Sequence, residues 1–145
     1  MIFKSNSERE TEQLGTELAM RLRPGDVVAL FGELGAGKTA FCRGLARGLG
    51  LTQRVTSPTF TIVNEYEDGS PAVPMFHFDM YRLGGSDELF ELGFDDYLER
   101  GGILAIEWSE RIADALPPTA IRVKITRDSD EIRTIEVEDS DEIKR

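Results

Sequence analysis

Residues 32–39 read Gly32-Glu33-Leu34-Gly35-Ala36-Gly37-Lys38-Thr39, which fits the pattern G-x-x-x-x-G-K-[ST] of a phosphate-binding loop. Residues 27–31 before the loop are all apolar and predict a buried strand. After the loop, Phe41, Leu45 and Leu49 recur at helical spacing and predict a helix. Together they predict an anion site, because a helix N-terminus offers unpaired N–H groups and the positive end of its dipole.

The sequence predicts different tasks for the backbone and the side chains of this loop. Its glycines let the backbone curl so that successive N–H groups point inward. Lys38 supplies a positive charge for the outer phosphates of a nucleotide, and the Thr39 hydroxyl can ligate Mg²⁺. The residues predicted to bind the nucleotide are Gly32, Glu33, Leu34, Gly35, Ala36, Gly37, Lys38, Thr39 and Ala40.

The chain has 145 residues, a net charge of −10 and a sequence pI of about 4.6. We expect a single domain over residues 1–145, small enough that a partner supplies what it lacks. The negative charge disfavours direct contact with DNA or RNA. The single cysteine cannot form an internal disulfide, and no apolar run reaches the ~18 residues of a membrane helix. Without a signal-peptide pattern, a soluble cytoplasmic protein is expected.

Three serines mark the predicted starts of helices. Ser7 and Glu10 have the spacing of a capping box ahead of an amphipathic helix. Ser86 is predicted to cap a short helix over residues 87–92, and Ser109 to cap another that ends before two prolines.

The strand pattern completes the fold prediction. Residues 59–66 and 72–81 alternate on either side of a short turn and predict an antiparallel hairpin, and residues 128–130 form the turn of a second, C-terminal hairpin. Residues 103–106 are fully apolar, like residues 27–31, which suits the buried centre of a sheet. We therefore predict an α/β three-layer sandwich of the P-loop NTPase type, with a central mixed sheet and the hairpins at its edges.

Two predicted strands end in a carboxylate, Asp79 and Glu107. The carboxyl ends of strands in open α/β sheets border the ligand crevice. Glu107 follows the cleaner buried strand and is assigned the second Mg²⁺-ligand position, called Walker B. Asp79 is a rival for the metal and a candidate to position water. Asp79, Glu107 and Lys38 are the candidate catalytic residues, the alternative for each acid being a solvated strand end.

Four further features keep two interpretations each, and a fifth has one. His77, the only histidine, is interpreted as a hydrogen-bonded structural residue in preference to a catalytic one. Arg82 could neutralise phosphate charge or form a structural ion pair. Residues 57–61 could sense the terminal phosphate or begin a strand. Trp108 could be core or contact a partner, and Cys42 is interpreted as a small buried helix residue.

The base of the nucleotide is predicted from a missing motif. The only two asparagines, Asn6 and Asn64, lack the N-K-x-D context that reads guanine, so ATP is favoured over GTP. An L-S-G-G-Q stretch is also missing, which disfavours a transporter-type ATPase.

Four ordered segments, residues 32–39, 57–61, 77–83 and 106–108, resemble the bacterial TsaE (formerly YjeE) family of tRNA threonylcarbamoyladenosine biosynthesis. The resemblance implies that Thr39 and Glu107 hold Mg²⁺ and that Asp79 is needed for ATP hydrolysis. It also implies an ATPase that is weak alone and acts with TsaD and TsaB homologues, contacting tRNA only through that complex.

Two other functions remain open on the residues alone. A small-molecule kinase would transfer the terminal phosphate to an acceptor, although the chain has no evident lid or acceptor-binding insertion. A nucleotide-dependent adaptor would hydrolyse ATP only incidentally.

Overall fold

A computed structural model describes residues 1–33, 35–52, 54–56, 63–67, 73–81 and 85–138. The described strands form one sheet in the order β1-β7-β6-β2-β5-β4-β3. The strands are β1 (Ile2–Ser5), β2 (Val27–Phe31), β3 (Val63–Tyr66), β4 (Met75–Asp79), β5 (Ile103–Glu107), β6 (Ile121–Arg127) and β7 (Arg133–Glu138). The helices are α1 (Glu8–Ala19), α2 (Lys38–Gly48), α3 (Ser86–Glu91), α4 (Phe94–Glu99) and the 3₁₀ segment η1 (Ser109–Ala115).

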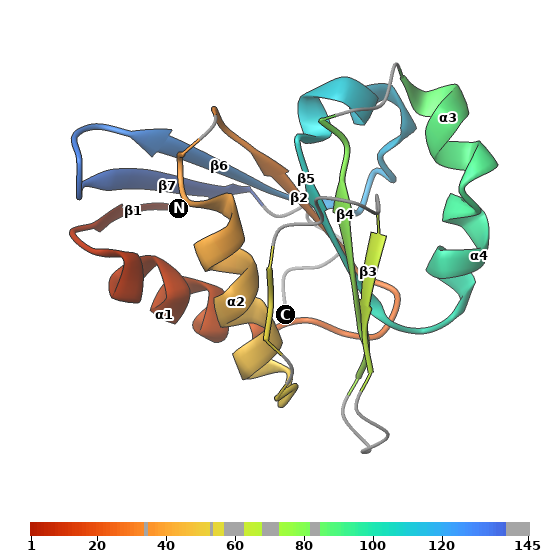
Figure 1. The fold of residues 1–145 in the computed structure, drawn as a ribbon, viewed down its shortest axis with the longest axis horizontal. Coiled ribbons are helices and arrows are strands. Elements are labelled where there is room, and N and C mark those ends of the chain that lie inside the picture. The colour runs from red at the N-terminus through yellow and green to blue at the C-terminus, as the bar shows by residue number, and fades with distance from the viewer. Residues whose placement is uncertain (34, 53, 57–62, 68–72, 82–84, 139–145) are drawn as a thin grey trace.

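The sheet is mixed, as predicted. Its centre is parallel: β2 pairs with both β5 and β6, and β4 pairs with β5. The β3–β4 and β6–β7 pairs are antiparallel hairpins, which confirms both predicted hairpins. Figure 1 shows α1 and α2 on one side of this sheet and α3, α4 and η1 on the other, so the three-layer α/β prediction is confirmed.

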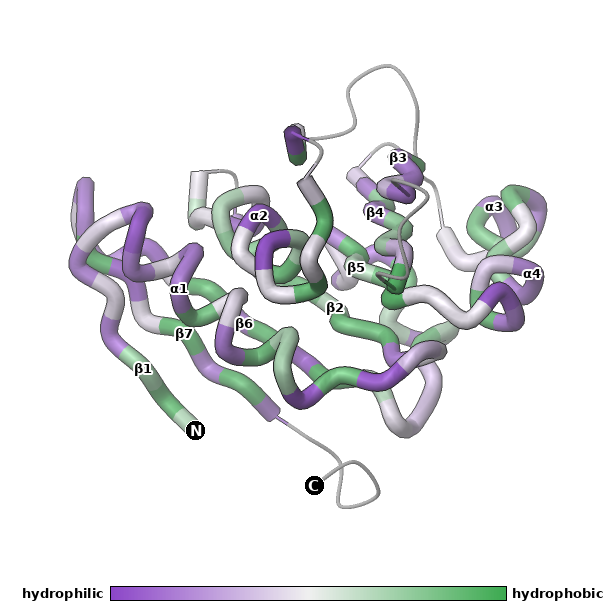
Figure 2. Tube along the Cα trace, turned by 90° about the horizontal axis from the view of Figure 1, so that it is seen from below, coloured by the Kyte–Doolittle hydropathy of each residue, from purple (hydrophilic) through white to green (hydrophobic). Residues whose placement is uncertain are grey.

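Two hydrophobic clusters hold the layers together, one on each face of the sheet. Side chains alternate along a strand, so Val28 of β2 joins the cluster under α1 and α2, whereas Val27 joins the cluster under α3, α4 and η1. The central strand β2 and the first four residues of β5, Ile103–Ile106, are accordingly apolar (Figure 2). Phe76 and Phe78 of β4 pack in the second cluster, and the alternation of side chains along the strand leaves His77 on the α2 side.

The prediction that both hairpins lie at sheet edges is wrong for the second one. β6 pairs with the central strand β2, and β1 pairs with β7 and takes the edge position. β1 is a four-residue strand, too short for its alternation to be recognised. The position of β1 depends on pairing with β7, near the other end of the described chain. This pairing is accompanied by a hydrogen bond of 3.1 Å from the N-terminal ammonium to the Val137 carbonyl oxygen.

Of the three predicted serine caps, only Ser7 caps its helix. Its hydroxyl accepts a hydrogen bond from the Glu10 N–H at 3.1 Å. Ser86 lies inside α3, and its hydroxyl donates to Asp114. Ser109 is fully buried and donates to the Ile106 carbonyl oxygen at 2.9 Å. Both were mispredicted because tertiary acceptors lay within reach of these hydroxyls, which local sequence does not reveal.

Glycines bring α1 against α2, the helix that follows the phosphate-loop sequence. A methyl group added to Gly44 would collide with the Glu12 carbonyl oxygen, and one added to Gly15 would collide with the Phe41 carbonyl oxygen. The close approach of the helices also lets the Thr16 hydroxyl donate a hydrogen bond of 3.0 Å to the Gly44 carbonyl oxygen. The seam therefore fixes α2 against α1.

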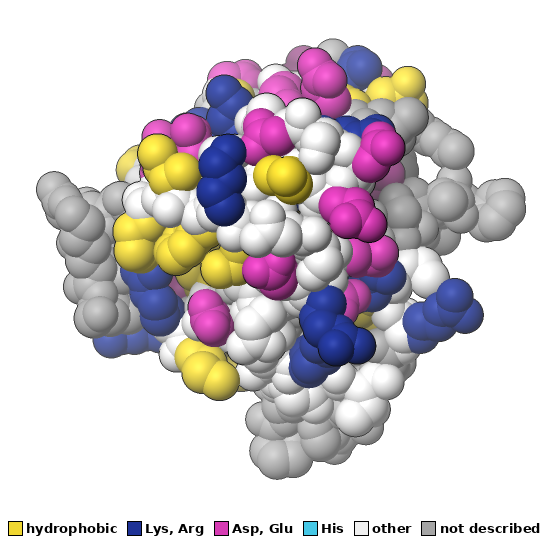
Figure 3. Space-filling model, turned by 90° about the vertical axis from the view of Figure 1, so that its left-hand side faces the viewer, with side chains coloured by type: hydrophobic (Ala, Val, Ile, Leu, Met, Phe, Trp, Pro, Cys, Tyr) yellow, Lys and Arg dark blue, Asp and Glu magenta, His cyan; other side chains and the backbone are white. Residues whose placement is uncertain are grey.

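Charged side chains surround this seam at the surface. Arg43 of α2 pairs with Glu8 and Glu12 of α1, the second at 3.2 Å. Figure 3 shows Lys and Arg side chains interspersed with Asp and Glu on this end of the molecule. Such exposed pairs contribute roughly 0–1 kcal/mol each, so the buried seam, not the pairs, holds the helices together.

We predict that Gly44→Ala lowers the free energy of unfolding by about 1–3 kcal/mol. Alanine favours a helix by about 1 kcal/mol over glycine, but the methyl would meet a backbone carbonyl that no side-chain rotation can move. Urea unfolding measures the difference.

Gly85→Ala is the control, because a methyl there would meet open space and the backbone is extended, with φ 162°. Its effect should stay within about 0.5 kcal/mol. Equal stability of the Gly44 and Gly85 variants would contradict the tight seam.

Candidate functional site

The loop between β2 and α2 has the backbone that its glycines predict. Gly32, Gly35 and Gly37 have φ values of 151°, 79° and 111°, a region that side chains disfavour. Gly32 also has no space for a side chain, because a methyl group would lie 2.6 Å from the Ile125 carbonyl oxygen. Leu34, another predicted loop residue, lies outside the described residues.

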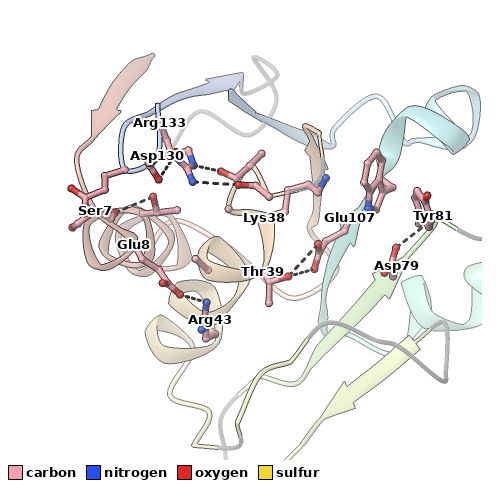
Figure 4. Close-up of a pocket in the computed structure, with 17 residues that line it drawn as sticks. Ser7, Glu8, Lys38, Thr39, Arg43, Asp79, Tyr81, Glu107, Asp130 and Arg133 are labelled. Carbon is pink, nitrogen blue, oxygen red and sulfur yellow. Dashed lines mark hydrogen bonds and ion pairs between the residues drawn. The ribbon is translucent and has the colours of Figure 1, made fainter. Parts of the chain in front are cut away.

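A cavity of about 620 Å³ opens at the start of α2, within the ~300–1,000 Å³ of small-molecule sites. Its lining includes most of the predicted nucleotide-binding residues and both predicted acids (Figure 4). They are Gly35, Ala36, Gly37, Lys38, Thr39, Ala40, Asp79 and Glu107. Gly32 and Glu33 are not in the lining and instead bind the side chain of Lys38.

Lys38 is folded back onto its own loop. Its ammonium donates to the carbonyl oxygens of Gly32 and Glu33, the second at 3.2 Å, and lies 3.6 Å from the centre of the Trp108 ring. Burial lowers the pKa of Lys38, and the charge of Glu107 partly offsets this effect. The ammonium is therefore held by carbonyl dipoles and an aromatic face in place of water.

Trp108 makes a contact that the sequence did not reveal. It follows β5 with φ 60° and is the one described non-glycine residue with positive φ, immediately before η1. Its ring packs on Tyr81, with centroids 5.0 Å apart, and covers Lys38. Trp108 also packs against the hydrophobic cluster under α3, α4 and η1, in line with the core alternative, but its position over the loop lysine was not predicted.

The two predicted metal ligands meet at the centre of the site. Thr39 lies in the first turn of α2 and Glu107 ends β5, and the Thr39 hydroxyl is 3.2 Å and 3.4 Å from the two Glu107 carboxylate oxygens. Glu107 is 3% exposed. A hydroxyl and a carboxylate beside a water-accessible cavity suit Mg²⁺, which takes oxygen ligands and keeps several waters. The donor set therefore fits this ion.

Asp79 reaches the same edge of the sheet, because it is paired with Glu107 in the β4–β5 register. Its carboxylate accepts a hydrogen bond from the Tyr81 N–H at 3.0 Å and lines the cavity. Glu107 thus contacts α2, whereas Asp79 is held against its own strand end (Figure 4). The structure brings both acids together but gives them different partners.

Two buried residues lie behind this edge. His77 is fully buried, and its Nε2 lies 2.5 Å from a Glu107 carboxylate oxygen, so the prediction of a hydrogen-bonded His is confirmed. Cys42 is buried as predicted, and burial raises the pKa of its thiol. Arg82 and residues 57–61 lie outside the described residues.

Arg133 is a further lining residue that sequence reasoning missed. It begins β7, and its guanidinium donates to the carbonyl oxygens of Ala36 at 2.8 Å and Gly35 at 3.3 Å. The same group donates to carbonyl oxygens of the β6–β7 turn, including Ser129 at 2.7 Å. It ties the turn to the glycine loop, a contact between residues about one hundred positions apart that has no local signal.

The fold and the site define an α/β protein in which a glycine-rich loop, a Thr–Glu pair and a cavity meet at one sheet edge. Residues 5–135 match the family model "Threonylcarbamoyl adenosine biosynthesis protein TsaE". The chain belongs to the TsaE family.

Similar proteins match this chain over most of their own length. The chain is 41% identical to a Bacillus subtilis protein over 92% of this chain and 82% of the relative. It is 38% identical to a Treponema pallidum protein over 92% and 96%, respectively. Both relatives are named tRNA threonylcarbamoyladenosine biosynthesis protein TsaE. A crystal structure of Bacillus subtilis YdiB superimposes with a TM-score of 0.79 at 36% identity, covering 94% of this chain and 83% of that one.

None of the described helices is long and apolar enough to cross a membrane.

We predict that Arg133→Ala lowers the free energy of unfolding by about 2 kcal/mol, because hydrogen bonds from a charged group to the loop carbonyls are lost. Thermal or urea unfolding of the purified variant measures this effect.

Arg127→Ala is the matched control, since Arg127 lies in the same hairpin but forms an exposed pair with Asp130. Its loss should cost less than about 1 kcal/mol. A larger effect for Arg127 than for Arg133 would refute the assignment of Arg133 as the link to the loop.

Proposed function

We propose that this protein is a Mg²⁺-dependent ATPase that supports formation of threonylcarbamoyladenosine in tRNA, together with TsaB and TsaD homologues. The observation that carries the proposal is the Thr39–Glu107 pair, held within the cavity at the start of α2. The names of the relatives supply the pathway.

The nucleotide phosphates would bind at the glycine loop. The start of α2 offers N–H groups and the positive end of the helix dipole to them. Lys38 would leave the Gly32 carbonyl oxygen and the Trp108 ring and turn toward the outer phosphates. A phosphate oxygen is a stronger partner for an ammonium than a neutral carbonyl, so the exchange is favourable.

Thr39 and Glu107 would hold the metal. When bound, the ion would supply positive charge against the phosphate charge that develops during hydrolysis. His77 orients Glu107 from behind, so that the carboxylate faces Thr39. This leaves Asp79, which is fixed by the Tyr81 N–H at the cavity wall, to position the attacking water.

The rest of the chain fits an accessory role. We propose one domain over residues 1–145 that acts in the cytoplasm and reaches tRNA only through its partners. A net charge of −10 opposes direct contact with nucleic acid, which TsaB and TsaD homologues would make instead.

We predict that Glu107→Ala weakens binding of Mg²⁺-ATP, whereas Asp79→Ala leaves binding intact and lowers hydrolysis by about 100-fold, the scale of a lost positioning group. Calorimetry measures binding, and phosphate release in the presence of the partner proteins measures hydrolysis. Glu99→Ala, in α4 on the other face of the sheet, is the control and should match the wild type in both assays. If both acid variants kept wild-type affinity and rate, the site assignment would fail.

The pathway role is tested by tRNA modification over many turnovers with purified TsaB and TsaD homologues. Lys38→Ala should abolish both partner-stimulated hydrolysis and repeated modification. Modification that continues without hydrolysis would instead identify a nucleotide-dependent adaptor. Transfer of the phosphate to an added acceptor, without free phosphate, would identify a kinase.

A further inference from the structure

Three potential metal ligands of different chemistry gather behind the Thr39–Glu107 pair. They are Cys42 of α2, His77 of β4 and Glu107 of β5, and their ligand atoms all lie within 4.8 Å of one another. Cys42 and His77 are fully buried and Glu107 is 3% exposed. The Thr39–Glu107 pair accounts for Glu107 but leaves the thiol without a function.

The secondary structure explains why the three side chains converge. Cys42 follows Thr39 by three residues, so both lie on the same face of α2. His77 is paired with Ala105, and Glu107, two residues further along β5, projects from the same face of the sheet. That face is the one α2 covers. The cluster is thus a consequence of helix and strand periodicity.

The second nitrogen of His77 is independent evidence for a ligand. Its Nε2 faces Glu107, but its Nδ1 is buried and has no hydrogen-bond partner among the described residues. Buried polar atoms without a partner are uncommon, because their loss of hydration is not compensated. A neutral imidazole with an unpartnered nitrogen is a ready metal donor.

We propose that Cys42, His77 and Glu107 form a binding site for a thiophilic divalent cation of the Zn²⁺ class. Sulfur, imidazole nitrogen and carboxylate oxygen are the three donor types that Zn²⁺ and Co²⁺ accept together, whereas Mg²⁺ prefers oxygen alone. One thiolate and one carboxylate would balance the charge of the cation, which a buried site requires. The thiol proton is released to water as the metal–sulfur bond forms.

The geometry needs only small movements. Around a tetrahedral ion, neighbouring ligand atoms lie about 3.3–3.6 Å apart. The present His77–Glu107 separation of 2.5 Å would open, and the widest ligand separation of 4.8 Å would close. Glu107 also lines the cavity, so an ion can enter there and keep a fourth, water-filled position.

Occupation of this site has a consequence that rests on the proposed function. Glu107 would turn from Thr39 toward the thiolate and the imidazole, and Mg²⁺ would lose its carboxylate ligand. Because Zn²⁺ would draw this carboxylate away from Thr39, binding of Zn²⁺ should oppose Mg²⁺-dependent hydrolysis.

The site itself is tested without any activity measurement, by titrating tag-free protein with Co²⁺ in buffer free of thiol reductants. We expect absorption bands of tetrahedral Co²⁺ together with a sulfur-to-cobalt charge-transfer band. Cys42 is the only cysteine in the chain, so such a band reports this residue alone. In the isosteric Cys42→Ser variant the charge-transfer band should vanish and the affinity fall by at least about tenfold. Co²⁺ bound to the wild type without a thiolate band, or no Co²⁺ bound at all, would overturn the proposal.

Inhibition is tested separately, by adding Zn²⁺ to ATP hydrolysis at excess Mg²⁺. The Cys42→Ser variant should keep its Mg²⁺-dependent rate but need at least about tenfold more Zn²⁺ for half inhibition. Equal inhibition of variant and wild type would overturn the link to Glu107. If hydrolysis is never observed, the proposed function fails, whereas the Co²⁺ spectrum still decides the metal site.

Discussion

The hydrogen bond from Thr39 to Glu107 joins the two parts of the molecule on which the site depends. One partner begins the helix after the glycine loop, and the other ends the central strand β5. The contact requires α2 to keep a fixed position on the sheet, and the close glycine contacts between α1 and α2 provide this. It also requires β4 and β5 to stay in register, because His77 approaches the same carboxylate from the neighbouring strand. Helix packing and strand register therefore converge on a single side chain.

Glu107 is shared between two polar partners, because the Thr39 hydroxyl and His77 Nε2 lie 3.2 Å and 2.5 Å from the same carboxylate oxygen. Thr39 lines the cavity, whereas His77 and Cys42 are fully buried, with their ligand atoms within 4.8 Å of a carboxylate oxygen. A hard ion on the cavity side and a softer ion on the buried side would draw on the same ligand. The chemistry of this small protein would then depend on which side the carboxylate faces.

The sequence alone was sufficient to predict those features that depend on interactions between neighbouring residues. The strand, glycine turn and helix of residues 27–48 are encoded by neighbouring residues, as is the capping of α1 by Ser7. The meeting of Thr39 with Glu107 was also predictable, because parallel strands deliver their carboxyl ends to one sheet edge.

Contacts between distant segments were not predictable in the same way. β1 was missed, and with it the position of the second hairpin, because four residues carry too little pattern to reveal pairing with β7. The position of Trp108 over Lys38 depends on a left-handed backbone conformation that its residue type disfavours. Arg133 reaches Ala36 only because the complete sheet places them together. In each case the decisive partner lies far away in the sequence.

Whether Thr39 and Glu107 hold one metal ion together can be measured by a double-mutant cycle of Thr39→Val and Glu107→Gln on Mg²⁺-dependent ATP hydrolysis. Residues that act as a unit have strongly non-additive effects. If they share one ion, the double variant should hydrolyse ATP about as fast as the slower of the two single variants. Additive losses, with the two effects multiplying in full, would show instead that the two side chains act independently and hold no common ion.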